Sequence, residues 1–236
     1  MSEDFVHLHT HSHSSVFDGF GTEQAFVERA AEMGQPALAL TEHGSLRSLH
    51  AARLATEAAG IKLIPGIEAY LCDDAEGRGV TADEKAKLKA GGTPKAEITS
   101  QVKALEKERK DRDHITIWAL NNEGLRNLYR LNAWAWTEGF YHKPRIDVKR
   151  LKQFSVGLAV SSGCPNGVIP SPLRAGEKLE AIARVETLAE IFGDRFYIEI
   201  MPHVLEDDNG VTAKLLTLAD RVGASVLATQ DAHYPR

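Results

Sequence analysis

The sequence predicts an α/β protein whose strands close into a distorted barrel of about seven strand–helix units. Three observations support this fold class. Short apolar runs of strand length alternate with amphipathic helical stretches, an order typical of a mostly parallel sheet covered by helices. The 236 residues suffice for one sizeable core. Side chains that bind metals recur where successive predicted strands end, which is where barrel enzymes carry their functional groups.

The first third of the chain contains three predicted strands and two predicted helices. Thr22 is a suitable N-cap for the first helix, and Gly34 follows its end. Pro65 and Gly66 are expected to interrupt the third strand. We expect strands over residues 5–10, 37–41 and 61–71, and helices over residues 22–33 and 46–59.

Residues 73–113 differ from the rest of the chain. They carry 20 charged side chains, ten of each sign, and no aromatic residue, so this stretch cannot bury much surface by itself. Ile98, Val102 and Leu105 recur at helical spacing, which predicts a surface helix in its second half. We interpret the stretch as a charged, partly mobile insertion into a single domain that spans residues 1–236.

The alternation of strands and helices resumes after the insertion. Leu125, Leu128, Leu131 and Ala135 lie on one face of a predicted helix, and Gly193 closes the next one. We expect strands over residues 114–120, 156–161, 195–200 and 224–229, and helices over residues 123–136, 177–192 and 211–222.

Composition narrows the functional class. Hydrophobic residues make up 43% of the chain and charged residues 26%, as in ordinary globular proteins. The formal net charge of −5 argues against a bulk electrostatic nucleic-acid binder. Two cysteines, Cys72 and Cys164, are too few for a disulfide framework. No apolar run approaches the roughly 18 residues that span a membrane, and the acidic N-terminus does not resemble a secretory signal, so we expect a cytoplasmic protein without a membrane partner.

Histidine and carboxylate side chains gather at the predicted strand ends. His9 and His11 alternate along the first strand, so both imidazoles can face one ion. The mixture of imidazole, carboxylate and thiol suits zinc, manganese or iron, and paired ions serve phosphoryl transfer. His114 is an exception, because it opens its strand. The other residues of this kind are Asp18, Glu42, His43, Glu68, Cys164, Asp231 and His233.

Each of these residues also has an ordinary structural explanation. A lone His-X-His pair is a weak signal, Cys164 alone could be a small buried hydrophobic residue, and Glu68 alone could form an ion pair. Their joint occurrence at successive strand ends favours a metal centre. His7 shares the face of His9 and is expected to line the site or support a ligand from behind, whereas His13 is expected in a solvated loop.

Seven groups of motifs occur in a characteristic order: FVHLHTHS (5–12) with FDG (17–19), PALALTEHG (36–44), GIKLIPGIEAY (60–70), NEGLRNL (122–128), EGFYHKPRID (138–147), SSGC (161–164) and TQDAHY (229–234). Together they resemble the polymerase-and-histidinol-phosphatase (PHP) domain, in the form found at the N-terminus of the bacterial DNA polymerase III alpha subunit. The resemblance covers nearly the whole chain except the charged insertion. The GFYxKPRID stretch favours the polymerase form over the histidinol phosphatase.

This resemblance implies a distorted seven-stranded βα barrel of the PHP type that holds two to three divalent ions of zinc, manganese or iron. All nine family ligand positions carry a competent residue here, which favours an active site over a vestigial one. The first set of ligands would also be the catalytic set. By position, the resemblance assigns His9, His11, Glu68 and Asp231 to the first ion, the bridging Glu68 with His114 and Cys164 to the second, and Asp18, His43 and His233 to the third.

The chain departs from the family pattern at a few positions. Glu42 stands where Asp is usual, Gln230 where Asn is common, and His13 where Glu is usual. The sequence stops at Arg236, where an alpha subunit would continue into its catalytic palm, so we expect no polymerase active site in this chain.

We therefore expect a metal-dependent phosphoesterase that acts as a 3′–5′ exonuclease on DNA 3′ ends. It would proofread within or beside a bacterial or phage replicative polymerase. Arg145, Lys143 and His203 are candidate contacts for substrate phosphates. Two alternatives stay open: a small-molecule phosphatase of the histidinol phosphate type, and a non-catalytic module that stabilises a polymerase or binds replisome subunits.

Overall fold

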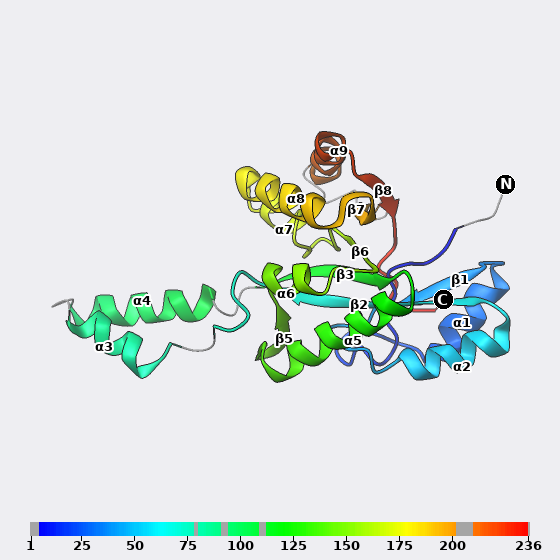
Figure 1. The fold of residues 1–236 in the computed structure, drawn as a ribbon, viewed down its shortest axis with the longest axis horizontal. Coiled ribbons are helices and arrows are strands. Elements are labelled where there is room, and N and C mark those ends of the chain that lie inside the picture. The colour runs from blue at the N-terminus through cyan, green and yellow to red at the C-terminus, as the bar shows by residue number, and fades with distance from the viewer. Residues whose placement is uncertain (1–4, 78–79, 91–93, 109–111, 202–209, 236) are drawn as a thin grey trace.

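The computed structural model describes residues 5–77, 80–90, 94–108, 112–201 and 210–235. Within these ranges the central feature is a curled sheet with the strand order β4-β5-β2-β3-β6-β7-β8, and β1 also pairs with β2 (Figure 1). The strands are β1 (Ala37–Leu40), β2 (Lys62–Leu71), β3 (Asp113–Ala119), β4 (Phe140–Tyr141), β5 (Lys143–Ile146), β6 (Leu158–Ser161), β7 (Phe196–Ile200) and β8 (Ser225–Ala228).

Helices pack around the outside of this sheet. One group lies beside β1 and β2, and another lies beside β6 and β7 on the opposite side (Figure 1). The predicted cap of the first helix is confirmed, because Thr22 Oγ1 accepts a hydrogen bond from the Ala25 amide. The helices are α1 (Glu23–Glu32), α2 (Leu49–Ala59), α3 (Ala82–Ala90), α4 (Lys95–Glu108), α5 (Asn122–Thr137), α6 (Val148–Gln153), α7 (Pro170–Arg174), α8 (Lys178–Phe192), the 3-10 turn η1 (Gly193–Arg195) and α9 (Val211–Val222).

The N-terminal segment closes the curled sheet into a ring. The strand expected over residues 5–10 forms only isolated parallel bridges, from His7 to Leu38 in β1 and from Thr10 to Ala232 after β8. Backbone hydrogen bonds of 2.9 Å join Thr41 N to Thr10 O and His11 N to Ala232 O. This segment therefore lies between β1 and the chain that follows β8. Together with β1, β2, β3, β6, β7 and β8 it makes a distorted seven-stranded barrel, and the β4–β5 hairpin pairs with the end of β2.

Strand β3 runs against the direction expected of it. It pairs antiparallel with both β2 and β6, whereas β1–β2, β2–β5, β6–β7 and β7–β8 are parallel pairs. The sheet is therefore mixed rather than mostly parallel. The register pairs Tyr70 with His114, so the beginning of β3 lies beside the end of β2. His114, which opens its strand, thus reaches the same end of the barrel as side chains that close theirs.

One other local expectation needs correction, and one element of the sheet was not predicted. β2 continues unbroken through Pro65 and Gly66. Pro65 pairs with Leu40, the last residue of β1, and Gly66 suits the strand because a Cβ there would lie 2.8 Å from Cδ1 of Trp118. The short hairpin of β4 and β5 was not expected from the sequence, because Pro and the charged residues Lys143 and Arg145 fill most of β5.

Polar and apolar residues alternate along the barrel strands. In β3, Ile115 and Ile117 belong to the apolar cluster formed with α5 and α8 outside the sheet, and the intervening Thr116 is also fully buried. Since successive strand residues face opposite sides, Thr116 faces the barrel interior. There its hydroxyl donates a hydrogen bond to Glu199 of β7, which also accepts one from the Ser161 hydroxyl of β6. The barrel interior below the candidate site is therefore polar and closed to solvent.

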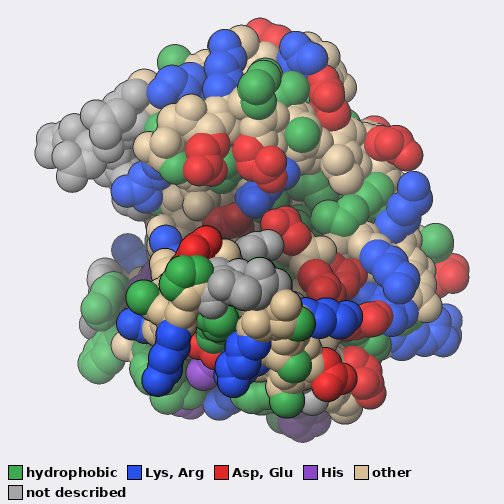
Figure 2. Space-filling view, turned by 90° about the vertical axis from the view of Figure 1, so that its left-hand side faces the viewer, with side chains coloured by type: hydrophobic (Ala, Val, Ile, Leu, Met, Phe, Trp, Pro, Cys, Tyr) green, Lys and Arg blue, Asp and Glu red, His purple; other side chains and the backbone are tan. Residues whose placement is uncertain are grey.

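The charged insertion forms two helices, α3 and α4, that project from the barrel (Figure 1). The predicted helix in its second half is confirmed as α4. Acidic and basic side chains are interspersed over the face of the molecule seen in Figure 2, without a large area of one sign. Among the described residues, no helix is both long and apolar enough to cross a membrane.

Candidate metal centre

One end of the barrel gathers every residue that the sequence singled out as a metal ligand. The N-terminal segment and the loop after it, the ends of β1 and β2, the beginning of β3 and the loops after β6 and β8 each contribute side chains. We call them the nine-residue cluster: His9, His11, Asp18, His43, Glu68, His114, Cys164, Asp231 and His233.

Glu68 lies at the middle of the nine-residue cluster. Its carboxylate is buried, with Oε1 2.8 Å from His114 Nδ1 and 3.4 Å from His9 Nε2. Oε2 lies 3.7 Å from His11 Nε2 and also contacts His43 Nδ1. Burial alone would raise the pKa of Glu68, but hydrogen bonds from the surrounding imidazoles hold it well below its usual range. Glu68 is therefore an anion that faces four imidazoles.

Asp231 approaches the same imidazoles from the loop after β8. Its Oδ1 lies 3.2 Å from His11 Nε2, 3.4 Å from His9 Nε2 and 3.7 Å from His233 Nδ1. The residue has a φ of 47°, in the left-handed region that Asp tolerates better than most residues. Burial raises the pKa of Asp231, but the nearby imidazoles of His9 and His11 outweigh it and lower the pKa to about 2.

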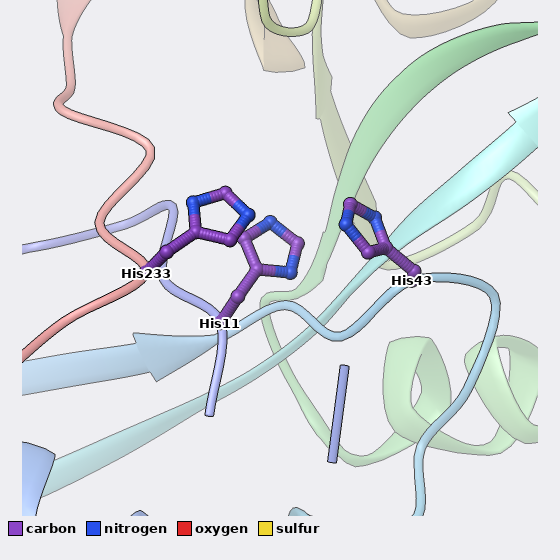
Figure 3. Close-up of side chains that lie close together, drawn as sticks. All are labelled: His11, His43 and His233. Atoms are coloured by element: carbon purple, nitrogen blue, oxygen red, sulfur yellow. The ribbon is translucent and has the colours of Figure 1, made fainter. Parts of the chain in front are cut away.

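Asp18 and two imidazoles form the outer part of the cluster. Asp18 Oδ2 lies 3.1 Å from His43 Nε2, and Oδ1 lies 3.7 Å from His233 Nε2. The ring of His11 stacks between those of His43 and His233, with centroid distances of 4.2 and 4.5 Å (Figure 3). The carboxylate of Asp18 is half-exposed, so this part of the cluster opens toward solvent.

Cys164 lies at the opposite side of the cluster, after β6. Its Sγ is 3.4 Å from His114 Nδ1. Burial and the nearby charge of Glu68 raise the pKa of the Cys164 thiol well above its usual range. Because a thiolate rather than a thiol binds metal ions, Cys164 must lose a proton to serve as a ligand, and doing so costs more here than for an exposed cysteine.

Several buried polar atoms of the cluster lie close to one another but form no well-aligned hydrogen bond among the described residues. They are His9 Nε2, His11 Nε2, His43 Nδ1, Glu68 Oε2 and Asp231 Oδ1. Leaving such atoms unsatisfied costs free energy, whereas nitrogen and carboxylate ligands of this kind satisfy a divalent cation. Three overlapping groups place their ligand atoms within 4.8 Å of one another: His9–His11–Asp231, His11–His43–His233 and His43–Glu68–His114. The residues present fit divalent ions.

In two imidazoles, the ring nitrogen that points away from the cluster lies within hydrogen-bond distance of an oxygen atom. His9 Nδ1 lies 2.7 Å from the Glu199 carboxylate, and His233 Nδ1 lies 2.8 Å from the Asp231 carbonyl. Both oxygens only accept hydrogen bonds, so each Nδ1 carries a proton, and in the neutral imidazole Nε2 keeps its lone pair. This tautomer directs the Nε2 lone pair toward the cluster, the arrangement found behind metal-binding histidines.

Glu199 is the functional residue that the sequence reasoning missed. It lies in β7, is buried, and accepts hydrogen bonds from Thr116, Ser161 and Thr229 as well as His9. Burial alone would lower the pKa of His9, but the charges of Glu199 and Asp231 raise it well above its usual range. The available signal was a single acidic residue within the apolar run FYIEI at 196–200.

Glu42 has a comparable role behind His11. Its buried carboxylate accepts hydrogen bonds of 2.6 Å from the hydroxyls of Ser12 and Ser15. Because the Ser15 hydroxyl donates to Glu42, it accepts from His11 Nδ1, 2.9 Å away. The Glu at position 42 therefore holds the loop that carries His11 and gives this histidine the same tautomer as His9.

The three candidate phosphate contacts separate in the structure. Lys143 lies beside the cluster, with Nζ 4.9 Å from the centre of the Phe17 ring and 5.3 Å from that of Tyr70. Arg145 is fully buried and donates hydrogen bonds to the carbonyls of Gly139, Ala75 and Gly77. The expectation for Arg145 therefore needs correction, since its guanidinium holds the chain at the start of the insertion. His203 falls outside the described residues.

The remaining N-terminal histidines have separate surroundings. His7 packs edge-on against Phe5, with ring centroids 4.9 Å apart, and burial lowers its pKa. His13 is exposed, with Nδ1 3.2 Å from the carbonyl of Gly21. Of the four histidines in the first 13 residues, His9 and His11 thus belong to the cluster, and His13 lies in the expected solvated loop.

Solved structures of low sequence identity share this fold. One is a two-domain protein from Bacteroides vulgatus that contains a predicted PHP-like metal-dependent phosphoesterase, with a TM-score of 0.57 and 17% identity, covering all of this chain and 55% of that one. Another, from Bifidobacterium adolescentis and assigned as a metal-dependent phosphoesterase, gives a TM-score of 0.53 at 14% identity and covers 99% of this chain and 89% of that one.

Curated relatives match the chain at higher identity. The DNA polymerase III alpha subunits of Aquifex aeolicus and Treponema pallidum are each 34% identical, over 99% and 98% of this chain. That of Thermus aquaticus is 35% identical over 98% of it. The chain spans less than a fifth of the length of these relatives, 18% of the first two and 17% of the third. The PHP domain family model matches residues 7–203, and the chain therefore belongs to the PHP domain family.

Proposed function

We propose that this protein is a metal-dependent phosphoesterase that removes nucleotides from the 3′ end of DNA. One observation carries the proposal: nine ligand-type side chains from distant parts of the chain meet at one barrel end, and five of their buried nitrogen and oxygen atoms form no well-aligned hydrogen bond among the described residues. A purely structural module has no evident need for such an arrangement, because unsatisfied buried polar atoms are destabilising.

The cluster divides into three sets of ligands around the shared carboxylate of Glu68. The contacts between Glu68, Asp231 and the two imidazoles of the N-terminal segment support the first set, and the 2.8 Å contact between His114 and Glu68 supports the second. The contacts of Asp18 with His43 and His233 support the third. We propose two to three zinc, manganese or iron ions, held by the residues that the family resemblance assigns to each set.

The chain's own residues prepare the centre for attack on a phosphodiester. Glu199, Ser15 and the Asp231 carbonyl hold imidazole rings with Nε2 free, so that few groups need to move when an ion binds. Ions held there would supply Lewis acidity toward the phosphoryl oxygens and a water that is activated at neutral pH. Lys143, at the open side of the cluster, is placed to neutralise a phosphate that enters from solvent.

The choice of DNA as substrate rests on the relatives. They are DNA polymerase III alpha subunits, in which this chain corresponds to less than a fifth of the length. An exonuclease within or beside such a polymerase would remove misincorporated nucleotides and so take part in DNA replication. Replisome subunits are then the expected protein partners.

The proposal is tested by metal analysis together with hydrolysis of a 3′-labelled primer in Mn²⁺, Zn²⁺ and Mg²⁺. We expect bound metal and shortening of the primer from its 3′ end. His9→Ala and Asp231→Ala should each reduce the rate by more than about 100-fold, because each removes a ligand. His13→Ala is the matched control, since it removes an exposed imidazole from the same segment and should leave the rate unchanged.

Two outcomes would contradict the proposal. A protein that binds no metal and cleaves nothing would be a non-catalytic module of a polymerase. A protein that hydrolyses p-nitrophenyl phosphate much faster than the primer, with the same dependence on His9 and Asp231, would be a small-molecule phosphatase.

A further inference from the structure

Three aromatic side chains stand exposed beside the nine-residue cluster. Phe17, Phe20 and Tyr234 are 88%, 71% and 62% exposed, although large aromatic rings are normally buried more fully. We call these three residues the aromatic rim. Phe17 directly precedes Asp18, and Tyr234 directly follows His233, so two of the rings are attached next to members of the cluster.

The two loops that carry the aromatic rim are joined to one another. The Phe20 amide donates a 2.8 Å hydrogen bond to the His233 carbonyl, and the rings of Phe20 and Tyr234 lie 5.9 Å apart. Phe20 and Tyr234 therefore form a continuous surface made by two chain segments more than 200 residues apart, and Phe17 is carried by the same loop as Phe20.

The backbone beneath the rim is held in place by close contacts. A Cβ at Gly19 would lie 1.9 Å from the Ser12 carbonyl oxygen, and Gly21 has a φ of +112° with Pro235 against it. The Gly19 amide also donates to the Ser15 carbonyl at 2.9 Å. Only glycine fits this path, so the loop presents Phe17 and Phe20 to solvent instead of folding them against the barrel.

A cation accompanies the rings. The ammonium group of Lys143 lies 4.9 Å from the centre of the Phe17 ring, within the range of a cation–π contact. A positive charge that follows phosphates, combined with exposed rings on which bases stack, is the usual way in which proteins bind single-stranded nucleic acids. A small phosphomonoester would need the ions and the cation but not several exposed rings.

We propose that the aromatic rim stacks the bases at the 3′ end of a single-stranded nucleic acid, while the adjoining phosphate reaches the nine-residue cluster. This inference rests on the proposed phosphoesterase function and specifies how that site selects its substrate. Phe17 would contact a base beside the phosphate that meets Lys143, and Phe20 with Tyr234 would continue the stacking surface. Recognition through ring faces would be tolerant of base sequence, because every base has an aromatic face.

The test uses the 236-residue chain and an oligonucleotide that carries 2-aminopurine at its 3′ end, whose fluorescence is quenched by stacking. A phosphorothioate at the last linkage slows cleavage during the titration. Phe17→Ala should weaken binding by about 5- to 150-fold, the range measured for loss of one stacked base, and should reduce the quenching. Phe17→Trp should restore both, whereas Phe17→Leu, which keeps an apolar side chain without a ring face, should not.

Matched measurements separate this inference from the function on which it rests. Leu179→Ala removes an equally exposed apolar side chain from α8, 82% exposed, and should change nothing. Hydrolysis of bis(p-nitrophenyl) phosphate reports on the centre without a base. If the wild-type protein cleaves neither substrate, the phosphoesterase proposal fails. If it cleaves both while Phe17→Ala binds the oligonucleotide as well as wild type, or if Phe17→Leu restores binding as fully as Phe17→Trp, stacking is refuted and the rim is a protein contact instead.

Discussion

The nine-residue cluster and the α3–α4 insertion are both rich in charged side chains, yet they use them in opposite ways. In the cluster, Glu68 is 1% exposed and its partners come from segments far apart in sequence. In the insertion, Glu97 is exposed, and it accepts a hydrogen bond from Gln101 one helical turn away. A buried charge requires specific partners, whereas an exposed one is stabilised by water and contributes little through its local pair.

The physical consequence is that the two regions should respond differently to the same kind of change. Removing one charge from the cluster leaves other buried groups without a partner, and removing one from the insertion leaves only solvated neighbours. This contrast allows the same substitution to be made in both regions, with the insertion as the internal control.

The largest expected effect is that of Glu68→Gln. This substitution keeps the size of the side chain but removes the anion that faces four imidazoles. We expect loss of bound metal and a decrease in exonuclease rate of more than about 100-fold. Elemental analysis and the primer assay measure the two effects. Glu97→Gln is the control, and an equal loss in both variants would show that burial does not distinguish the two regions.

A smaller effect is expected from Glu199→Gln, because Glu199 is outside the cluster and contacts it through His9. The amide can still accept the hydrogen bond from His9 Nδ1, but the negative charge that raises the pKa of His9 is lost. We expect metal affinity to fall by about 10- to 100-fold, the usual cost of losing support behind a ligand. Titration with a metal-sensitive dye measures this change.

Glu190→Gln provides the comparison for Glu199→Gln, since Glu190 is an exposed carboxylate on α8 that pairs with Lys152. It should bind metal like the wild-type protein. Wild-type affinity in Glu199→Gln would mean that the hydrogen bond alone, without the charge, is sufficient to support His9.

Acid should weaken the metal-free protein through Asp231. Its pKa is lowered from 3.8 to about 2 in the folded state. The ionised carboxylate therefore adds to the free energy of unfolding above pH 3.8, and this contribution is lost as the pH falls toward 2. The difference corresponds to about 2 kcal/mol. Urea unfolding of the metal-free protein at pH 4.5 and pH 2.5 measures it. Asp231→Asn should reduce the difference between the two pH values, and an unchanged pH dependence in this variant would contradict the assignment.

The smallest effect is expected from removing α3 and α4 and joining their flanking residues with a short Gly/Ser linker. The residues of α3 are exposed or half-buried, and both helices project from the barrel (Figure 1). We expect metal content to be unchanged and the primer rate to stay within about twofold, since loop length affects stability only weakly. A large loss of hydrolysis would instead place the insertion over the substrate.

Much of the fold could be predicted because local patterns report directly on local structure. The capping residue Thr22 and the spacing of Leu125, Leu128 and Leu131 predicted helices close to α1 and α5. His9 and His11, two residues apart in an extended segment, had to face the same side. The family motifs extended this reasoning to the distorted barrel and to the residues of the cluster.

Other features depend on contacts between distant segments. The direction of β3 follows from its pairing with β2 and β6, and no periodicity within residues 113–119 distinguishes a parallel from an antiparallel strand. This reversal explains why His114 could begin its strand and still reach Glu68. Similarly, the bridges of His7 and Thr10 close the barrel without forming a regular strand, because each pairs with a different neighbour.

Residues of similar type have different roles in this protein because they differ in burial. Arg145 and Lys143 are two positions apart in one motif, yet Arg145 is enclosed by backbone carbonyls and Lys143 lies against the exposed ring of Phe17 beside the cluster. Glu199 and Glu97 are both glutamates, and only Glu199 is enclosed. Amino-acid type sets the chemistry that a side chain can perform, and this is readable from the sequence. The tertiary structure decides which water molecules and partners surround it, because desolvation arises only when distant segments pack together.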